Sequence, residues 1–325
     1  HPFGCMTSVR QQAEKAIANK LQGGRSVKRA LIIGASTGYG LSSRIVSAYS
    51  AGADTLGVYF ERPPKEEKPA SAGFYNSLAF GKLSKSLDSQ HIDVNGDAFS
   101  NECKLEVVEK AKQLGGPFDL VIYSLASPRR TDPESGDTFR ACLKPIGAVY
   151  RNKTLDTDKH EVKEVSIDPA NGDEIEHTRK VMGGEDWKLW TELLLRENLL
   201  ADGCMNLAYS YIGPEVTQPI YRNGTIGKAK EDLENSASEI TEFMQKHCRG
   251  KAFVSVNKAV VTQASSAIPV VPLYVSLLFK VMREQGTHEG CIEQIIRMFN
   301  ERLYTENETV PVDDEGRIRL DDWEM

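Results

Sequence analysis

The sequence predicts an α/β fold of the Rossmann type, a doubly wound parallel sheet with helices on both faces and a small inserted region. Short apolar runs alternate with amphipathic helical stretches from residue 30 onward, the pattern of successive βαβ units. A glycine-rich turn at residues 34–40 separates the first apolar run from the first helical stretch. The 325 residues are 40% hydrophobic and 26% charged, which excludes a collagenous, low-complexity or wholly disordered chain.

Strands are expected at residues 30–33, 55–60, 92–94, 118–123, 206–211 and 252–256, the third being the weakest. The first run is apolar at every position, as expected of a parallel strand buried on both faces. Helices are expected from the glycine turn to residue 50 and at residues 74–87, 102–114, 185–197, 226–246, 271–282 and 291–302. Charged and proline-rich residues 61–68 predict a loop. Right-handed crossovers then give a parallel sheet.

Residues 136–184 break this pattern, since they are polar and have no clear period. We expect them to form an insertion with short strands. Neither an internal repeat nor a flexible linker divides the chain. Residues 1–325 are therefore interpreted as a single domain.

Charge and cysteine content restrict the partners. The net charge of -6 and the pI near 5.7 exclude a general attraction to nucleic acid or anionic lipid. Six widely spaced cysteines show no metal-ligand spacing and indicate reduced thiols in a cytoplasmic protein. The longest apolar stretch, residues 268–279, contains Pro269 and Pro272 and is too short to span a bilayer.

The glycine-rich turn is the first candidate site. Gly34, Gly38 and Gly40 follow a G-x3-G-x-G spacing. Glycines let the backbone approach a pyrophosphate, which then meets the N–H groups of the following helix. The position directly after a strand favours nucleotide binding over a simple tight turn.

Further candidates follow the other strands. Glu61 ends the second strand, where a carboxylate accepts hydrogen bonds from a ribose diol and repels a 2′-phosphate, which favours NADH over NADPH. Arg62 leaves this preference open, because a guanidinium can pair with that phosphate, and both can be loop charges. Asp97 and Ala98 follow the third strand and either contact adenine or begin a helix. Residues 124–127 follow the fourth strand.

A tyrosine and two lysines form the candidate catalytic group. The Y-x3-K spacing of ordinary short-chain dehydrogenases is absent, but Lys228 and Lys230 follow Tyr221 at x6 and x8 spacings. A phenol beside an ammonium group can donate a hydrogen bond to a developing oxyanion, and the neighbouring charge is expected to lower its pKa. Either lysine satisfies this argument. A packed tyrosine with a solvated lysine is the alternative.

At this point the chain resembles a known family, the monomeric, NADH-dependent trans-2-enoyl-CoA reductases, which include the V-type bacterial enoyl-ACP reductases. The resemblance covers nearly the whole sequence. It rests on GASTGYG (34–40), YSLASPR (123–129), VMGGEDW (181–187), YSYIGP (209–214), IYRNGTIG (220–227), VTQASS (261–266) and GTHEGCIEQ (286–294).

The resemblance implies NADH-dependent reduction of enoyl-CoA or enoyl-ACP in fatty acid synthesis by a monomer. It implies that Tyr221 is the proton donor, that Lys230 rather than Lys228 holds the nicotinamide ribose, that Tyr211 contacts the thioester oxygen and that Thr262 begins the segment facing the enoyl group. The residues implied to surround NAD are Gly34, Ala35, Ser36, Thr37, Gly38, Tyr39, Phe60, Glu61, Asp97, Ala98, Leu125, Ala126, Lys230, Ala259, Val260 and Val261. Family members extend further at both ends, so we expect a chain truncated at both ends.

Several alternatives stay open. A reductase of another carbonyl substrate and a non-catalytic dinucleotide-binding module are the rival functions. Residues 265–274 either wall an acyl chain or begin a buried helix. Trp187 and Trp190 are expected in the core, and His288 and Cys291 in structural roles. The acidic chain disfavours an acidic carrier protein, although residues 129–130 offer a local basic patch.

Overall fold

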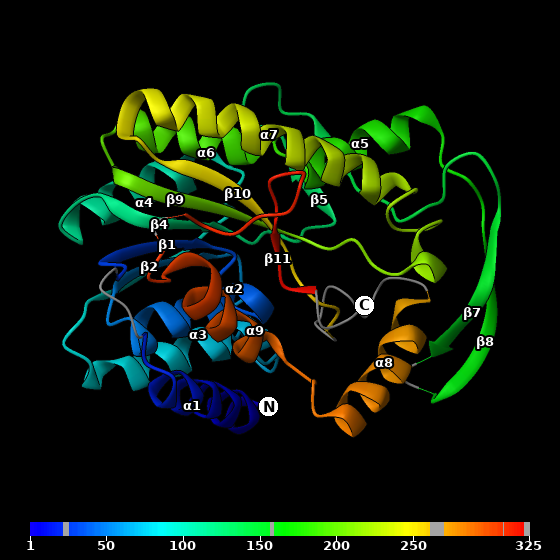
Figure 1. Ribbon diagram of the computed structural model, residues 1–325, viewed down its shortest axis with the longest axis horizontal. Coiled ribbons are helices and arrows are strands. Elements are labelled where there is room, and N and C mark those ends of the chain that lie inside the picture. The colour runs from blue at the N-terminus through cyan, green and yellow to red at the C-terminus, as the bar shows by residue number, and fades with distance from the viewer. Residues whose placement is uncertain (22–25, 157–158, 261–269, 308, 322–325) are drawn as a thin grey trace.

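A computed structural model describes residues 1–21, 26–156, 159–260, 270–307 and 309–321. Its centre is a seven-stranded sheet in which every described strand pair is parallel (Figure 1). In sheet order the strands are β11 (Ile318–Arg319), β10 (Lys251–Val256), β9 (Leu200–Ser210), β4 (Phe118–Tyr123), β1 (Arg29–Ile33), β2 (Asp54–Tyr59) and β3 (His91–Asn95).

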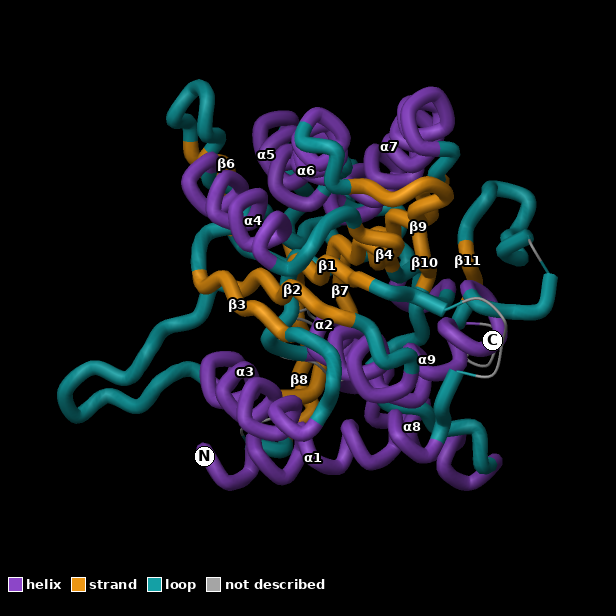
Figure 2. The backbone as a smooth tube through the Cα atoms, turned by 90° about the vertical axis from the view of Figure 1, so that its left-hand side faces the viewer, coloured by secondary structure: helices purple, strands orange, loops and turns teal. Residues whose placement is uncertain are grey.

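Helices cover both faces of this sheet, as Figure 2 shows. One layer contains α1 (Pro2–Ala18), α2 (Gly38–Ile45), α3 (Ala72–Leu83) and α9 (Cys291–Met298), and the other contains α4 (Asn101–Gln113), α5 (Gly172–Met182), α6 (Glu185–Arg196) and α7 (Thr225–Cys248). π-helical turns at Val46–Ser50 and Phe299–Leu303 extend α2 and α9. None of the helices in the described part is both long and apolar enough to cross a bilayer. The architecture is the predicted Rossmann-type α/β fold.

The sheet separates two hydrophobic cores. Along β1, Ala30 and Ile32 face the core with α2 and α9, whereas Leu31 and Ile33 face the core with α4 and α6. Successive side chains of a strand point to opposite faces, so a strand buried on both sides is apolar at every position. Trp187 and Trp190 on α6 are fully buried in the second core, which confirms their expected place.

The inserted region forms two antiparallel ribbons beside the main sheet. The first is β5 (Arg129–Thr131) with β6 (Thr138–Arg140), and the second is β7 (Tyr150–Asp156) with β8 (Glu161–Ile167). Helix α8 (Val271–Gln285) packs against β7. Both ribbons lie between β4 and α5 in the chain. The β7–β8 ribbon projects beyond the carboxyl edge of the sheet (Figure 1), whereas the β5–β6 ribbon packs against α5.

Four elements differ from the sequence-based expectation. Helix α1 was missed because its buried residues, Val9, Ala13 and Ala16, are mostly small. Helix α5 lies inside the polar region expected to hold only short strands, and an Asn171–Glu174 capping box marks its start. Strand β9 starts six residues earlier than predicted, beyond a register shift against β4. The two-residue strand β11 was not predicted.

The strand order places a crevice at the carboxyl edge of the sheet. From β1 the chain runs outward to β2 and β3, and then returns to β4 on the other side of β1. Ligands of open α/β sheets bind where the strand order reverses in this way. The segments after β1 and β4 therefore define the centre of the candidate site.

Candidate active site

The glycine turn after β1 packs closely against the end of β4. Gly34 has a φ of +96°, and a Cβ atom there would lie 2.2 Å from the carbonyl oxygen of Ser124. A Cβ on Gly40 would lie 2.0 Å from the carbonyl oxygen of Gly34. Side chains at these positions would collide with backbone atoms, so only glycine allows this tight turn.

The turn delivers the amino terminus of α2 to the crevice. Helix α2 begins at Gly38, and its N-cap residue Thr37 makes no side-chain capping bond. The first-turn N–H groups of a helix lack intrahelical partners and, with the helix dipole, favour an anion. The glycine turn and this helix start therefore fit the pyrophosphate of a dinucleotide.

Glu61 lies against the glycine turn. Its carboxylate accepts a hydrogen bond of 2.6 Å from the Ser36 hydroxyl. Asn95, at the end of β3, fixes the Glu61 backbone through hydrogen bonds of 2.8 and 2.9 Å. Arg62 is exposed, and the neighbouring Phe60 ring is 72% exposed. The structure thus brings Ser36 and Glu61 together and leaves the Phe60 ring open to a planar ligand.

Asp97 does not cap α4. Its side chain accepts a hydrogen bond of 3.1 Å from the Phe99 N–H group, whereas Ser100 is the N-cap residue of the helix. Asp97 therefore shapes the turn between β3 and α4, and the helix-start alternative is wrong.

Two buried side chains hold the backbone of Ala98 in place. Its carbonyl oxygen accepts hydrogen bonds from the Lys104 ammonium group at 2.9 Å and the Trp190 indole at 3.2 Å. Lys104 also pairs with the buried carboxylate of Asp186 at 2.8 Å. After β4, Leu125 is half-buried and Ala126 is exposed. The predicted adenine-side segment is thus anchored by a buried ion pair.

Tyr221 occupies a glycine-dependent turn before α7. A Cβ on Gly227 would lie 1.8 Å from the Arg222 carbonyl oxygen, and one on Gly224 would lie 2.7 Å from the Lys144 carbonyl oxygen. The Tyr221 side chain is only 5% exposed. Within the described part of the chain, its hydroxyl group has no hydrogen-bond partner. The phenol is therefore held by packing, with its hydrogen bond available for a ligand.

The environment of Tyr221 corrects one expectation. Burial raises the pKa of the phenol, whereas the sequence argument expected a neighbouring charge to lower it. Removing the ring from water disfavours the phenolate, and among the described residues no charged side chain offsets this effect. The hydroxyl group keeps its proton across the physiological range and is a hydrogen-bond donor.

The structure separates the two candidate lysines. Lys230 is half-buried, and its ammonium group donates a 3.1 Å hydrogen bond to the Tyr209 carbonyl oxygen. Burial lowers the pKa of Lys230 to about 8, and the opposing effect of Glu234 is smaller. Lys228 is exposed and pairs with Glu231 at 2.8 Å. Only Lys230 reaches the end of β9.

The end of β9 connects both candidate catalytic groups. The Tyr211 ring packs edge-on against the Tyr221 ring with centroids 5.0 Å apart, while Tyr209 accepts the hydrogen bond from Lys230. Two residues of extended chain cover roughly 7 Å. The phenol and the ammonium group are thus attached to neighbouring points of one strand end.

The segment after β10 completes the crevice. Ala259 and Val260 are buried there, and Val261 and Thr262 lie outside the described residues. The Tyr39 hydroxyl lies 2.6 Å from the Lys258 carbonyl oxygen and 2.8 Å from the Gln294 amide oxygen. Tyr39 therefore links the glycine turn to the β10 end.

Sequence analysis missed a buried ion network behind this segment. Lys258, which is 1% exposed, lies 3.1 Å from Glu289, and Glu289 also pairs with Arg297 at 2.9 Å. Lys258 lies 31 residues before Glu289, and the sequence alone does not indicate that they pair. The available signals were the position of Lys258 directly before the predicted cofactor residues and the place of Glu289 in the 286–294 string.

The remaining candidates take structural positions. The His288 ring packs edge-on against Phe279 at 4.6 Å. Burial raises the pKa of the Cys291 thiol to about 12, which makes it a poor nucleophile. Residues 265–269 of the expected apolar wall lie outside the described residues, while Val271 begins α8 and packs in a cluster with Val275, Ala259 and Tyr211.

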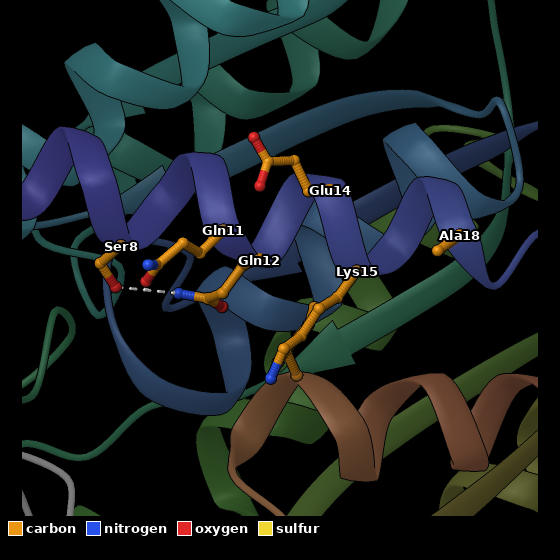
Figure 3. A pocket seen from close by; sticks show the side chains of 7 residues that line it. Ser8, Gln11, Gln12, Glu14, Lys15 and Ala18 are labelled. Atoms are coloured by element: carbon orange, nitrogen blue, oxygen red, sulfur yellow. Dashed lines mark hydrogen bonds between the residues drawn. The ribbon is translucent and has the colours of Figure 1, made fainter.

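An open surface cavity of about 570 Å³ lies away from these residues (Figure 3). It is lined by six α1 side chains and by Ile292 of α9, none of them a predicted site residue. Lys15 reaches across it to pair with Glu293. This cavity belongs to the α1–α9 contact rather than to the crevice at the sheet edge.

Comparison with known proteins agrees with this geometry. The NAD(P)H-binding domain of trans-2-enoyl-CoA reductase matches residues 1–66, and the trans-2-enoyl-CoA reductase catalytic region matches residues 68–304. An NADH-dependent enoyl-acyl-carrier-protein reductase of Flavobacterium johnsoniae is 57% identical over 100% of this chain and 81% of its own length. An NADH-dependent trans-2-enoyl-CoA reductase of Clostridium perfringens is 55% identical over 100% of this chain and 82% of its own length.

Solved structures show the same relationship. The trans-2-enoyl-CoA reductase of Treponema denticola, crystallised with NAD, superposes with a TM-score of 0.96 at 50% identity and covers 100% of this chain and 82% of its own. An NADH-dependent enoyl-acyl-carrier-protein reductase of Aquifex aeolicus, at 16% identity and a TM-score of 0.56, shares the fold. The chain belongs to the trans-2-enoyl-CoA reductase family.

Proposed function

We propose that this protein reduces trans-2-enoyl thioesters to saturated acyl thioesters with NADH, as a step of fatty acid synthesis. The observation that carries the proposal is the convergence of the buried Tyr221 phenol and the Lys230 ammonium group on the end of β9. This end lies in the same parallel sheet as the glycine turn, at the edge where open α/β sheets bind ligands.

The crevice residues fit NAD. The glycine turn and the start of α2 would hold the pyrophosphate, and Glu61 would accept hydrogen bonds from the adenosine ribose diol. The Lys230 ammonium group would hold the nicotinamide ribose. Bound NADH supplies the hydride that adds to C3 of the enoyl group. A carboxylate at position 61 disfavours a 2′-phosphate, which supports NADH over NADPH.

Tyr221 has two roles in this proposal. Reduction at C3 places negative charge on the thioester oxygen, and the phenol donates a hydrogen bond to that oxygen. Its proton is then transferred to the enolate at C2, and the phenolate that remains regains a proton from water before the next turnover. A donor placed where charge develops lowers the activation free energy by about 3–4 kcal/mol. Burial keeps the phenol protonated until it is needed.

Tyr211 is proposed to contact the same thioester oxygen as Tyr221. Its ring also belongs to the apolar cluster of Ala259, Val271 and Val275, with Tyr274 and Leu278 packed at its edge. Such a surface suits an acyl chain. Thr262 and Val261 are proposed to continue it toward the enoyl group.

Other properties of the protein follow the same proposal. The thioester is carried by coenzyme A or by an acyl carrier protein, since relatives named for each are similarly close. Six free cysteines fit a reducing, cytoplasmic environment. We also propose a monomer, with residues 1–325 as one reductase domain and residues 136–184 as its insertion.

Product analysis tests the activity. The protein is incubated with crotonyl-CoA and NADH, and the thioester is identified by mass spectrometry. We expect butyryl-CoA, and crotonyl carrier protein in a parallel reaction measures which handle is preferred. Reduction of acetoacetyl-CoA but not crotonyl-CoA would instead establish a carbonyl reductase.

A further inference from the structure

An ion pair links the Tyr221 turn to the helix that carries Lys230. Arg222 directly follows Tyr221 and donates two hydrogen bonds, of 2.9 and 3.2 Å, to the two carboxylate oxygens of Glu234. Both side chains are largely shielded from water, with exposed fractions of 26% and 15%. A bidentate arginine–carboxylate pair fixes the direction in which the carboxylate points.

Glu234 lies four residues after Lys230 on α7. Residues with this spacing are neighbours on one helix face, and opposite charges there attract each other. Nevertheless, Lys230 donates its hydrogen bond to Tyr209, and both oxygens of Glu234 are turned to Arg222. The carboxylate next to the lysine is thus engaged by another cation.

Arg317 is a second, weaker neighbour of Glu234. It approaches the carboxylate to 3.6 Å, but it is already paired with Asp313 at 2.8 Å and with Glu315 at 2.6 Å. Arg222 therefore supplies the main hold on Glu234. Lys230 lies one helical turn from this carboxylate, and Glu234 already acts to raise its pKa, so the loss of Arg222 would leave Glu234 free to turn toward the lysine.

We propose that Arg222 is a positioning residue that keeps Glu234 away from Lys230, so that the lysine ammonium group stays directed at the end of β9. This inference rests on the proposed role of Lys230 in holding the nicotinamide ribose. On this inference, Arg222 acts by holding the Glu234 carboxylate, which would otherwise compete for Lys230. A purely structural clamp would act through the Tyr221 turn instead.

The two explanations differ in a double substitution. In Arg222→Ala, Glu234 is released and captures Lys230, so we expect NADH affinity to fall about tenfold, as for loss of one hydrogen bond to a charged group. In Glu234→Ala the competitor is absent, and affinity should stay within about twofold of the original protein. Arg222→Ala/Glu234→Ala should then bind NADH about as well as Glu234→Ala. Affinity is measured by fluorescence titration.

A second readout needs no cofactor. Acetylation of Lys230 by acetic anhydride, followed by peptide mass spectrometry across a pH series, reports the protonation midpoint of this lysine. A released carboxylate stabilises the ammonium form. The midpoint should therefore rise in Arg222→Ala and fall again in the double variant, which lacks the carboxylate. Arg249→Ala, which removes an exposed ion pair with Asp202 beyond the far end of α7, is the matched control and should change neither readout.

The outcomes separate this inference from the proposed function. If the double variant binds NADH as weakly as Arg222→Ala, and the Lys230 midpoint does not move, the inference is overturned even though the unsubstituted protein reduces crotonyl-CoA. If the unsubstituted protein binds NADH but reduces no enoyl thioester, the proposed function fails instead. Thermal unfolding of each variant identifies any that have lost the fold.

Discussion

The Tyr211 and Tyr221 rings meet edge to face, with centroids 5.0 Å apart and planes at 79°. An edge-to-face pair of this kind places the positive edge of one ring on the negative face of the other and contributes about 0.5–1.5 kcal/mol. It fixes the Tyr221 phenol without using its hydroxyl group. The phenol proposed as the catalytic donor is thus oriented by packing, which leaves its hydroxyl group free to bind the substrate.

Tyr221→Phe keeps this ring contact and removes only the hydroxyl group. We expect turnover of crotonyl-CoA to fall by about 10²–10³, because the thioester oxygen loses its donor. NADH affinity and the thermal midpoint should be nearly unchanged. Tyr150→Phe removes a hydroxyl that donates to the Val216 carbonyl and accepts from the Asn152 amide, and it should retain activity. Equal effects of the two substitutions would refute the role of Tyr221.

Lys230→Met and Lys228→Met test the two lysine spacings. Lys230 reaches Tyr209, whereas Lys228 is exposed and pairs with Glu231. We expect Lys230→Met to raise the KM for NADH by about tenfold or more, the effect of losing a charged hydrogen bond. Lys228→Met should change it by less than about twofold. The reverse order would assign the nicotinamide ribose to Lys228.

The pH dependence of NADH binding follows from burial of Lys230. The folded protein lowers the pKa of this group to about 8, below its ordinary value. Below that pH the ammonium form is present and binds the ribose, and above it the proton is lost. NADH affinity should therefore decline as the pH rises through about 8, and this inflection should be absent in Lys230→Met. Fluorescence titrations across the pH range would measure it.

The lowered pKa of Lys230 makes stability depend on pH in the opposite direction from NADH affinity. Between the folded pKa of about 8 and the higher unfolded value, the unfolded chain binds more protons than the folded one. This group therefore makes the free energy of unfolding rise with pH in that window. Urea unfolding of Lys230→Met should show a shallower rise there. An unchanged slope would mean that Lys230 is not desolvated.

Glu61→Ala tests coenzyme preference. The substitution removes the carboxylate that accepts the Ser36 hydrogen bond and lies beside the glycine turn. Repulsion of a 2′-phosphate should fall while Arg62 remains, so the ratio of kcat/KM for NADH over NADPH should drop by about tenfold or more. Ser36→Ala retains the carboxylate and is the control. An unchanged ratio would show that Glu61 does not discriminate.

Lys104→Met tests the support beneath Ala98. Lys104 binds Asp186, which is also hydrogen-bonded by Tyr123 at 3.0 Å. Removing one partner of a buried pair leaves an uncompensated charge and costs about 3–5 kcal/mol of unfolding free energy. Lys104→Met/Asp186→Asn should recover part of this loss. Urea unfolding is the measurement, and a loss below about 1 kcal/mol would contradict the buried-pair account.

Most of the fold could be predicted because its central strands contain short, mainly apolar runs separated by helical stretches. Strands β1 and β4 begin and end within one residue of their predicted limits, and the glycine turn after β1 was evident from its spacing. Helix α1 and strand β11 could not be found in this way. The first buries mostly small residues in its core contact, and the second is a two-residue pairing with β10.

Candidate site residues could be predicted where the chemistry requires a particular residue type. They could not be predicted where contacts between distant segments determine which residue reaches the site. The glycines, Glu61 and the Tyr221 region carried local patterns. The choice between Lys228 and Lys230 depends on which helix face meets β9, and the sequence spacing alone left it open. The raised pKa of Tyr221 depends on burial by segments distant in the chain. Arg222 and Glu234 are separated by eleven residues, and their pairing required the turn before α7.

One assay tests the central claim most directly. The reduced nicotinamide absorbance is followed as the purified protein is mixed with NADH, before and after addition of crotonyl-CoA. We predict a steady loss of the band that begins only with the enoyl thioester and that Tyr221→Phe largely abolishes. Tight NADH binding with no loss of the band on adding any enoyl thioester would contradict the account.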